Sequence, residues 1–90
     1  MKFLHYEVSA QQGDIIHVTL RGTEANVRVM DDINFHAFQS GRQHRYAGGH
    51  FKSSPVNIPA PSSGKLNVVV DLGGYAGRLE ASVRVISRVA

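Results

Sequence analysis

Hydrophobic and polar residues alternate along four stretches of the chain, as they do in a β-strand that buries one face. The first stretch runs from Phe3 to Val8 and the second from Asp14 to Arg21. Because the residues between them, SAQQG, have the composition of a turn, we predict that the two form an antiparallel hairpin in which His5 faces His17. The other two stretches cover residues 25–30 and 78–89.

Two further segments predict strands of different kinds. The valine-rich run Lys65–Leu72 is expected at the centre of a sheet. The segment Pro55–Pro59 is typical of an edge strand, because proline has no N–H to donate to a neighbouring strand. With turns between these segments, the sequence predicts one all-β domain over residues 1–90, an antiparallel β-sandwich or jelly-roll-like barrel of six to eight short strands.

The middle of the chain, from Met30 to Lys52, departs from the strand pattern and predicts one short helical turn. Asp31 or Asp32 has a side chain suited to cap its start, and Gly41 is placed to end it. A helix this short needs tertiary contacts, so it must dock on the sheet. The apolar side chains available for docking are Ile33, Phe35 and Phe38.

Glycines mark two further breaks in the pattern. We expect Gly48–Gly49 to interrupt a short strand that begins at Arg45–Tyr46. The glycines within Gly73–Gly77 follow the valine-rich run and superficially suggest a dinucleotide-binding turn. That motif requires a helix next, whereas residues 78–89 alternate as a strand, so we predict an ordinary turn.

Composition and charge exclude several classes of function. The chain has no cysteine, which excludes disulfides, thiolate catalysis and cysteine-ligated zinc. The net charge of +3 is not gathered into a stripe of Lys and Arg, so nucleic acid is not the expected partner. No stretch has the length of a membrane span or the apolar centre of a signal peptide. We therefore expect a cytoplasmic protein without a membrane partner.

Charged and aromatic residues of the middle segment form the candidate site. Arg42 and Arg45 offer forked guanidinium groups to an anion, while Tyr46 and Phe51 offer flat rings. We predict a non-catalytic module that binds a small anionic molecule or a protein partner, with no cofactor, no metal and no catalytic residue. The predicted site residues are Asp31, Asp32, Asn34, Arg42, Arg45, Tyr46, Phe51 and, on a neighbouring turn, Tyr75.

Other functions compete with this prediction. The oxygen ligands of Asp31, Asp32 and Asn34 would suit a calcium-dependent, carbohydrate-binding-like domain. A hydrolase would use His36, His44 or His50, but no nucleophile motif accompanies them. His5, His17 and Glu7 could hold a metal between strands, although they are better explained as surface neighbours. A purely structural or homodimeric role is also open, because small sandwiches often pair at an edge.

Three sequence blocks carry a resemblance to a known family. They are Asp-Asp-x-Asn-Phe at residues 31–35, Arg-Tyr-x-Gly-Gly at residues 45–49 and Asp-Leu-Gly-Gly at residues 71–74. Over nearly its whole length the chain resembles a family of small bacterial domains of unknown function. The resemblance implies a β-sandwich that stands alone or precedes a TIR-like signalling domain, with a sensing or interaction role in defence signalling. It supplies no catalytic residues.

Overall fold

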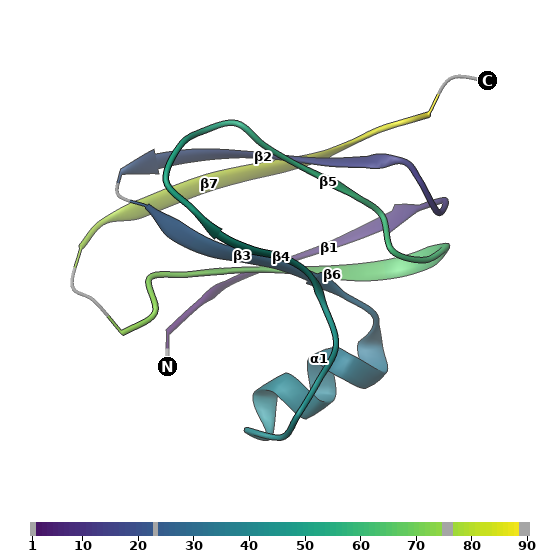
Figure 1. The fold of residues 1–90 in the computed structure, drawn as a ribbon, viewed down its shortest axis with the longest axis horizontal. Helices are drawn as coiled ribbons and strands as arrows, with labels where there is room; N and C mark the ends of the chain where they lie inside the picture. The colour runs from purple at the N-terminus through teal and green to yellow at the C-terminus, as the bar shows by residue number, and fades with distance from the viewer. Residues whose placement is uncertain (1, 23, 75–76, 89–90) are drawn as a thin grey trace.

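Seven β-strands and one helix make up the fold seen in a computed structural model that describes residues 2–22, 24–74 and 77–88 (Figure 1). The predicted all-β sandwich is confirmed. In chain order the elements are β1 (Leu4–Ala10), β2 (Ile15–Gly22), β3 (Ala25–Met30), α1 (Asp32–Gln39), β4 (Ala47–Phe51), β5 (Val56–Pro59), β6 (Gly64–Asp71) and β7 (Leu79–Ile86).

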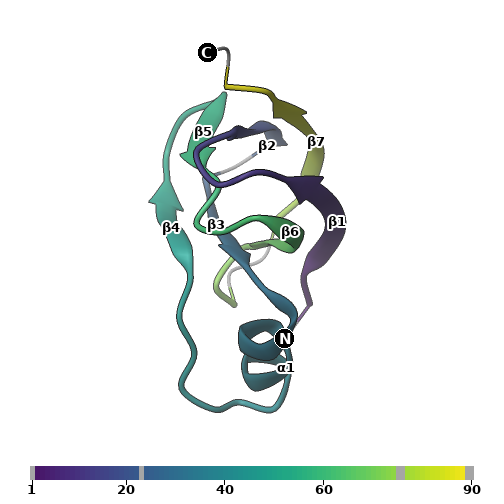
Figure 2. The ribbon, with the colours of Figure 1, turned by 90° about the vertical axis from the view of Figure 1, so that its right-hand side faces the viewer.

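The strands form two antiparallel sheets that face each other as layers (Figure 2). One sheet has the order β1-β6-β3-β4 and the other the order β5-β2-β7. The valine-rich strand β6 lies between β1 and β3, so its predicted central position is confirmed. Strand β5, bracketed by Pro55 and Pro59, is an edge strand as predicted.

Alternation along the strands produces the core between the sheets. In β2 the side chains of Ile16 and Val18 are fully buried, and in β3 those of Ala25, Val27 and Val29 are fully buried. Strand β6 differs because it is buried on both faces from Leu66 to Asp71. Its inner residues join the core, while its outer residues lie on the face that α1 covers. Because α1 covers part of it, the outer face of the four-stranded sheet is where a candidate site is expected.

The predicted β1–β2 hairpin is wrong. Strand β1 pairs with β6 in one sheet, and β2 pairs with β5 and β7 in the other, so His5 does not face His17. The turn between them bonds elsewhere: Gly13 N–H donates to the Ala60 carbonyl (3.1 Å), and Ala60 N–H donates to the Asp14 carbonyl (2.7 Å). The β1–β2 connection therefore docks on the β5–β6 connection, and both cross between the sheets.

The helix begins and ends where the sequence indicates. The Asp31 side chain accepts a hydrogen bond from Asn34 N–H, and Gly41 follows the C-cap with a φ of 72°, a conformation that glycine adopts most readily. The aromatic rings of Phe35 and Phe38 on α1 face the sheet, whereas Ile33 is 82% exposed and takes no part in docking. Among the described residues, no helix is long and apolar enough to cross a membrane.

The predicted break at Gly48–Gly49 is also wrong, since both glycines lie inside β4. Gly48 has a φ of 117°, and a Cβ built on it would lie 2.1 Å from the Val27 carbonyl oxygen. Glycine is thus required for β4 to approach β3 closely enough to pair. The two glycines continue the sheet instead of ending the strand.

Candidate functional site

Polar side chains gather on the outer face of the four-stranded sheet because of the strand register. Asn26 lies opposite Asp71 on one side and opposite His50 on the other. One row further along, Arg28 lies opposite Val69 and Gly48. Since directly paired residues point to the same face, three strands bring charged and amide groups together there.

Asp71 is the centre of this arrangement. Its carboxylate accepts hydrogen bonds from the Arg28 guanidinium (2.5 Å), the Asn26 amide (3.0 Å) and Gly73 N–H (2.7 Å). The Asp71 side chain is only 1% exposed, so its charge is stabilised by these donors and not by water. The Asp-Leu-Gly-Gly block therefore has a structural explanation: the turn after β6 bends back to donate to its own aspartate.

The Arg28 guanidinium lies between two aromatic rings. Its central carbon is 5.7 Å from the centre of the Phe38 ring and 5.3 Å from that of Tyr46. Phe38 comes from α1 and Tyr46 from the segment leading into β4, so the arginine links helix, strand and loop. The Arg28 side chain is 21% exposed, and such partial desolvation strengthens the attraction between a cation and a ring.

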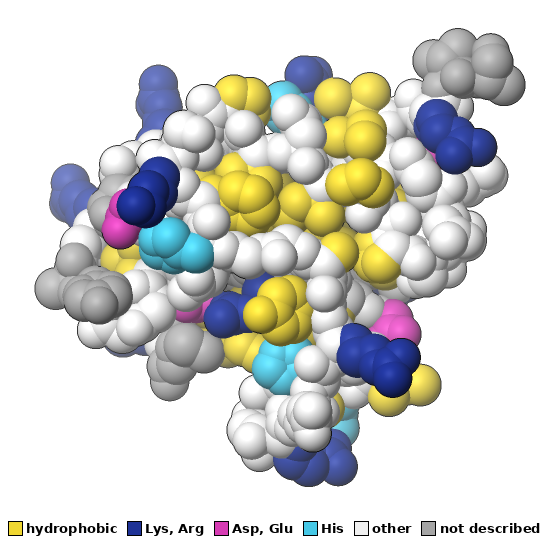
Figure 3. Space-filling view, in the orientation of Figure 1, with side chains coloured by type: hydrophobic (Ala, Val, Ile, Leu, Met, Phe, Trp, Pro, Cys, Tyr) yellow, Lys and Arg dark blue, Asp and Glu magenta, His cyan; other side chains and the backbone are white. Residues whose placement is uncertain are grey.

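More rings extend this cluster toward both sides of the helix. The His44 ring lies edge-to-face with the Phe38 ring, with 5.3 Å between ring centres, and its centre is 5.6 Å from that of the Tyr46 ring. On the other side, Phe35 stacks on His5 at 4.2 Å between ring centres, and Phe3 contacts Phe35 at 6.2 Å. Hydrophobic, basic and histidine side chains meet over the lower half of the face in Figure 3, close to α1. We call Arg28, Phe38, His44, Tyr46 and Asp71 the arginine cluster.

His44 is held at the surface of this cluster by its own loop. Its Nδ1 lies 2.9 Å from the Arg42 carbonyl oxygen, an acceptor, so Nδ1 carries the proton. The other ring nitrogen, Nε2, is buried without a hydrogen-bond partner among the described residues. The His44 ring packs against Phe38 and Tyr46 and is oriented by its hydrogen bond to the Arg42 carbonyl.

Two of the predicted site residues position the backbone. The Asp31 carboxylate accepts from Asn34 N–H (2.9 Å) and from the Asn34 side-chain amide (2.8 Å). The amide oxygen of Asn34 in turn accepts from Arg45 N–H (2.7 Å). This chain of bonds ties the segment after the helix to the start of the helix, which explains the Asp-Asp-x-Asn-Phe block. It places Tyr46 over Arg28.

Asp32 points to the sheet. Its carboxylate accepts from the Asn67 amide (2.8 Å) and lies 3.6 Å from the Lys65 ammonium. The hydrogen bond from Asn67 holds the pKa of the Asp32 carboxyl below its ordinary value, and the Lys65 charge acts in the same direction. Asp31 and Asp32 thus face different partners, and their oxygens do not converge on one point.

The other predicted residues divide between the surface and the core. Arg42 and Arg45 are exposed, and neither forms an ion pair among the described residues. Tyr46 is 46% exposed and belongs to the arginine cluster. Phe51 lies on the inner face of β4 and packs against the core, away from Tyr46. Tyr75 lies outside the described residues.

Sequence reasoning missed Arg28, Phe38, His44 and Asp71 as members of one site. A signal was present at two of these positions. Arg28 is an outward-facing charge in the middle of a predicted strand, and Asp71 is a charge near the end of the valine-rich run that was expected to be central. A charge next to a buried strand requires a partner, so the two could have been matched by that argument.

Histidine and acidic residues are dispersed over the structure. His17 Nδ1 lies 2.7 Å from the Asn57 amide oxygen in one sheet, while His5 Nε2 lies 2.8 Å from that of Asn67 in the other. Within residues 2–22, 24–74 and 77–88, no three His, Asp or Glu side chains are arranged to hold a metal ion. The metal hypothesis for His5, His17 and Glu7 fails because β1 and β2 belong to different sheets.

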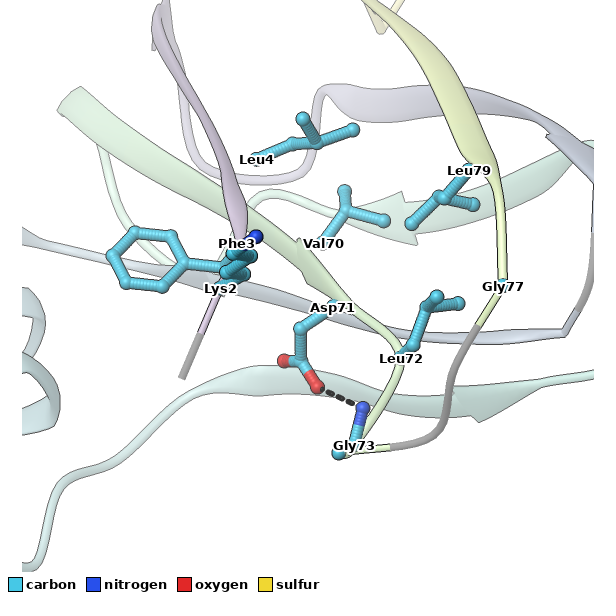
Figure 4. Close-up of a pocket in the computed structure, with 10 residues that line it drawn as sticks. Lys2, Phe3, Leu4, Val70, Asp71, Leu72, Gly73, Gly77 and Leu79 are labelled. Carbon is cyan, nitrogen blue, oxygen red and sulfur yellow. Dashed lines mark hydrogen bonds between the residues drawn. The ribbon is translucent and has the colours of Figure 1, made fainter.

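A hollow lies at the end of the sandwich where β1 and β7 begin (Figure 4). It measures about 1070 Å³, and Leu4, Val70, Leu72 and Leu79 form its apolar lining. Asp71 also lines it, with its carboxylate turned to Gly73 N–H. The hollow therefore meets the arginine cluster only at Asp71, whose oxygens already have donors.

Comparison with known proteins identifies the family. The family described as a domain of unknown function, DUF1883, matches residues 1–89, and the chain belongs to it. No curated protein and no solved structure gives a significant match. The resemblance noted from the three sequence blocks is thus confirmed at the level of a domain of unknown function.

Proposed function

We propose that this DUF1883 member is a non-catalytic binding module that recognises an anionic group, carried by a small molecule or by a protein partner. The binding surface is the arginine cluster together with Arg42 and Arg45. One observation carries the proposal: the Arg28 guanidinium lies against the rings of both Phe38 and Tyr46. Tyr and Arg are among the residue types enriched at the positions that contribute most binding energy in protein interfaces.

Charge supports an anionic ligand. Arg28 is neutralised by Asp71, Lys65 lies near Glu7 and Asp32, and His50 lies near Glu24. The guanidinium groups of Arg42 and Arg45 have no such carboxylate among the described residues. They belong to the segment that carries His44 and Tyr46, so positive charge without a local partner borders an exposed ring. A flat anion would gain from both.

The hydrogen bonds of the histidines support a non-catalytic role. His50 lies 3.0 Å from the Asn26 amide oxygen and 3.4 Å from the Glu24 carboxylate. His44 bonds to a backbone carbonyl. An activated serine or threonine would instead sit within hydrogen-bond reach of such a ring. We further propose a cytoplasmic setting, because a chain without cysteine needs no oxidising compartment.

The two acids at the start of the helix give little support to the calcium-dependent alternative. Asp31 already accepts two hydrogen bonds from Asn34, and Asp32 accepts one from Asn67. A calcium ion takes six to eight oxygen ligands gathered around one point. Here Asp31 and Asp32 would have to give up their present hydrogen bonds before their carboxylates could supply even two oxygen ligands to one ion.

The test is an NMR titration of the ¹⁵N-labelled protein with inorganic phosphate, a nucleoside triphosphate and a polyglutamate peptide. We expect shift changes to cluster at residues 42–50 and at Arg28. Arg45→Ala and Tyr46→Ala should each raise the Kd of any bound probe about tenfold or more. The matched control is Arg21→Ala, an exposed arginine at the end of β2, which should leave the Kd unchanged. Shift changes confined to other surfaces, or an Arg45→Ala variant with wild-type affinity for every bound probe, would refute the proposal.

A further inference from the structure

Strand β7 is an edge strand that is long and contains no proline. Within the described part of the chain its one pairing partner is β2, and it runs without interruption from Leu79 to Ile86. The opposite edge strand of the same sheet, β5, is half as long and is bracketed by prolines. Long, regular edges tend to pair with another strand. Figure 2 shows β7 beside β1 at one side of the molecule.

Two hydrogen bonds show which backbone groups of β7 face the open edge. Leu20, the β2 partner of Ala81, donates its N–H to the Ser54 hydroxyl (2.9 Å), away from β7. The Ala81 carbonyl accepts from the Tyr6 hydroxyl (3.0 Å), away from β2. Since backbone groups alternate along a ladder, the residues that point N–H and C=O outward are Leu79, Ala81, Val83 and Val85. A carbonyl oxygen accepts two hydrogen bonds, so Tyr6 does not block pairing at Ala81.

The seam between the sheets is also open at this edge. The inward side chains of β7 are only partly buried, as are those of β1 across from them. At the other seam, the inward side chains of Val56 and Ile58 in β5 are 2% and 4% exposed. On the outer face of the same strand, Ile86 is 41% exposed. Apolar surface is therefore left uncovered along the same edge that has free backbone groups.

We propose that this edge is the interface with a second copy of the chain: β7 pairs antiparallel with its counterpart about a two-fold axis through Ser82. In that register Glu80 of each copy faces Arg84 of the other, which forms two ion pairs. Arg78 faces the exposed Ile86, which its aliphatic stem can cover. The two three-stranded sheets become one continuous sheet.

Charge selects this register over its neighbours. An axis through Ala81 would place Arg84 opposite Arg78, a repulsive pair on each side of the axis. An axis through Val83 would place Glu80 opposite Ile86 and remove both ion pairs. Only the axis through Ser82 makes the strand complementary to itself, because like charges directly opposite destabilise a sheet.

The interface lies on the other sheet from the arginine cluster. Strand β7 belongs to the three-stranded sheet, whereas Arg28 and Asp71 lie on the outer face of the four-stranded sheet. Pairing would therefore leave both copies of the candidate binding surface open. The inference does not depend on the proposed function, and either can fail alone.

The experiment is sedimentation velocity over a range of protein concentrations. We expect the wild-type chain to reach the mass of a dimer. Glu80→Arg and Arg84→Glu should each weaken self-association about tenfold or more, because each turns two attractive pairs into repulsive ones. An equimolar mixture of these two variants should recover wild-type association, since each chain then supplies the charge that the other lacks.

Controls separate this interface from a loss of folding. Lys52→Glu reverses a charge at the far edge, in the β4–β5 connection, and should leave association unchanged. Glu80→Arg places two arginines together within one chain, because Glu80 lies opposite Arg21 on β2, whereas Arg84→Glu faces His17 and avoids that problem. Circular dichroism checks that each variant is folded. A wild-type chain that stays monomeric, or a dimer that both charge reversals leave intact, would overturn the inference, as would a mixture that does not recover.

Discussion

Arg28 and Asp71 form an ion pair across β3 and β6, 43 residues apart in the chain, with the aspartate side chain almost completely buried. The two residues do not lie directly opposite each other, because Arg28 is level with Val69 and Asp71 with Asn26. The long arginine side chain reaches diagonally between rows to the carboxylate. This diagonal positions the guanidinium under Tyr46, so a stabilising contact and the candidate binding surface share one residue.

Asp71→Asn is expected to lower the free energy of unfolding by about 2–3 kcal/mol. The amide keeps the shape of the side chain but removes the negative charge that balances Arg28, and its NH₂ group cannot accept. Urea denaturation measures the change. Glu7→Gln is the matched control, since the Glu7 side chain is 56% exposed near Lys65 and should change the free energy by less than about 0.5 kcal/mol. Equal effects of the two substitutions would contradict the central role of Asp71.

Asp31→Ala should cost about 1–2 kcal/mol in the free energy of unfolding, because it removes the cap from an eight-residue helix. It should also loosen the segment after the helix, since Asn34 would lose the partner that orients its amide toward Arg45. Hydrogen exchange at the Asn34 and Arg45 amides would show this as faster exchange. Asp31→Asn keeps an oxygen acceptor and should restore most of the protection. If alanine and asparagine behave alike, the cap does not hold this segment.

The pKa of Asp32 predicts how stability responds to acid. Because the folded protein holds this pKa below its ordinary value, chiefly through the hydrogen bond from Asn67, the charged form is favoured by folding. Its contribution is present above the unfolded pKa of about 4 and is lost as pH falls through the lowered folded pKa. Stability measured between pH 5 and 2 should therefore fall less steeply in Asp32→Asn than in the wild type. Superimposable pH profiles would contradict this.

The strand positions could be predicted from the sequence because alternation reports local burial. More and less buried side chains alternate along most of β1, β2, β3 and β7, the strands that correspond to the predicted stretches 3–8, 14–21, 25–30 and 78–89. The pairing of β1 and β2 could not be predicted in the same way. Each of these strands has one apolar face, and that face is buried in the core whether the two strands pair in one sheet or lie in the two facing sheets. Bonds from their turn to Ala60 decide between these arrangements, and they join residues distant in the chain.

The candidate site was predicted in part. The middle segment contributes Tyr46, but its partners Arg28 and Asp71 come from strands on either side of it in the sequence. Their meeting depends on the β3–β6 register, which alternation alone does not determine. Aromatic composition also misplaced Phe51, because the strand was predicted to be interrupted at Gly48–Gly49. Strand β4 continues through both glycines, and its alternation places Phe51 on the core side with Ala47.

Helix docking can be tested with two apolar residues that differ in environment. Ile33→Ser should change the free energy of unfolding by less than about 0.5 kcal/mol, because Ile33 is 82% exposed. Phe35→Ser should cost about 2–4 kcal/mol, because the ring stacks on His5 and contacts Phe3. Thermal denaturation of both variants provides the comparison. A large loss in Ile33→Ser would mean that the opposite face of α1 is the docked one.

The adjacent glycines Gly48 and Gly49 in β4 differ in how much space a larger side chain would have. Gly48 adopts a φ of 117°, and an added Cβ would lie 2.1 Å from the Val27 carbonyl oxygen, a backbone atom that cannot move without breaking the ladder. Gly49 has no atom within 4 Å of an added Cβ. Gly48→Ala should therefore lower the free energy of unfolding by at least about 2 kcal/mol, whereas Gly49→Ala should change it by less than about 1 kcal/mol in either direction. Because β4 follows Tyr46 directly, Gly48→Ala should also shift the NMR signals of Tyr46 and Arg28, and Gly49→Ala should leave them in place. If the two alanines are equally tolerated, the close approach of β4 to β3 does not limit the position of Tyr46.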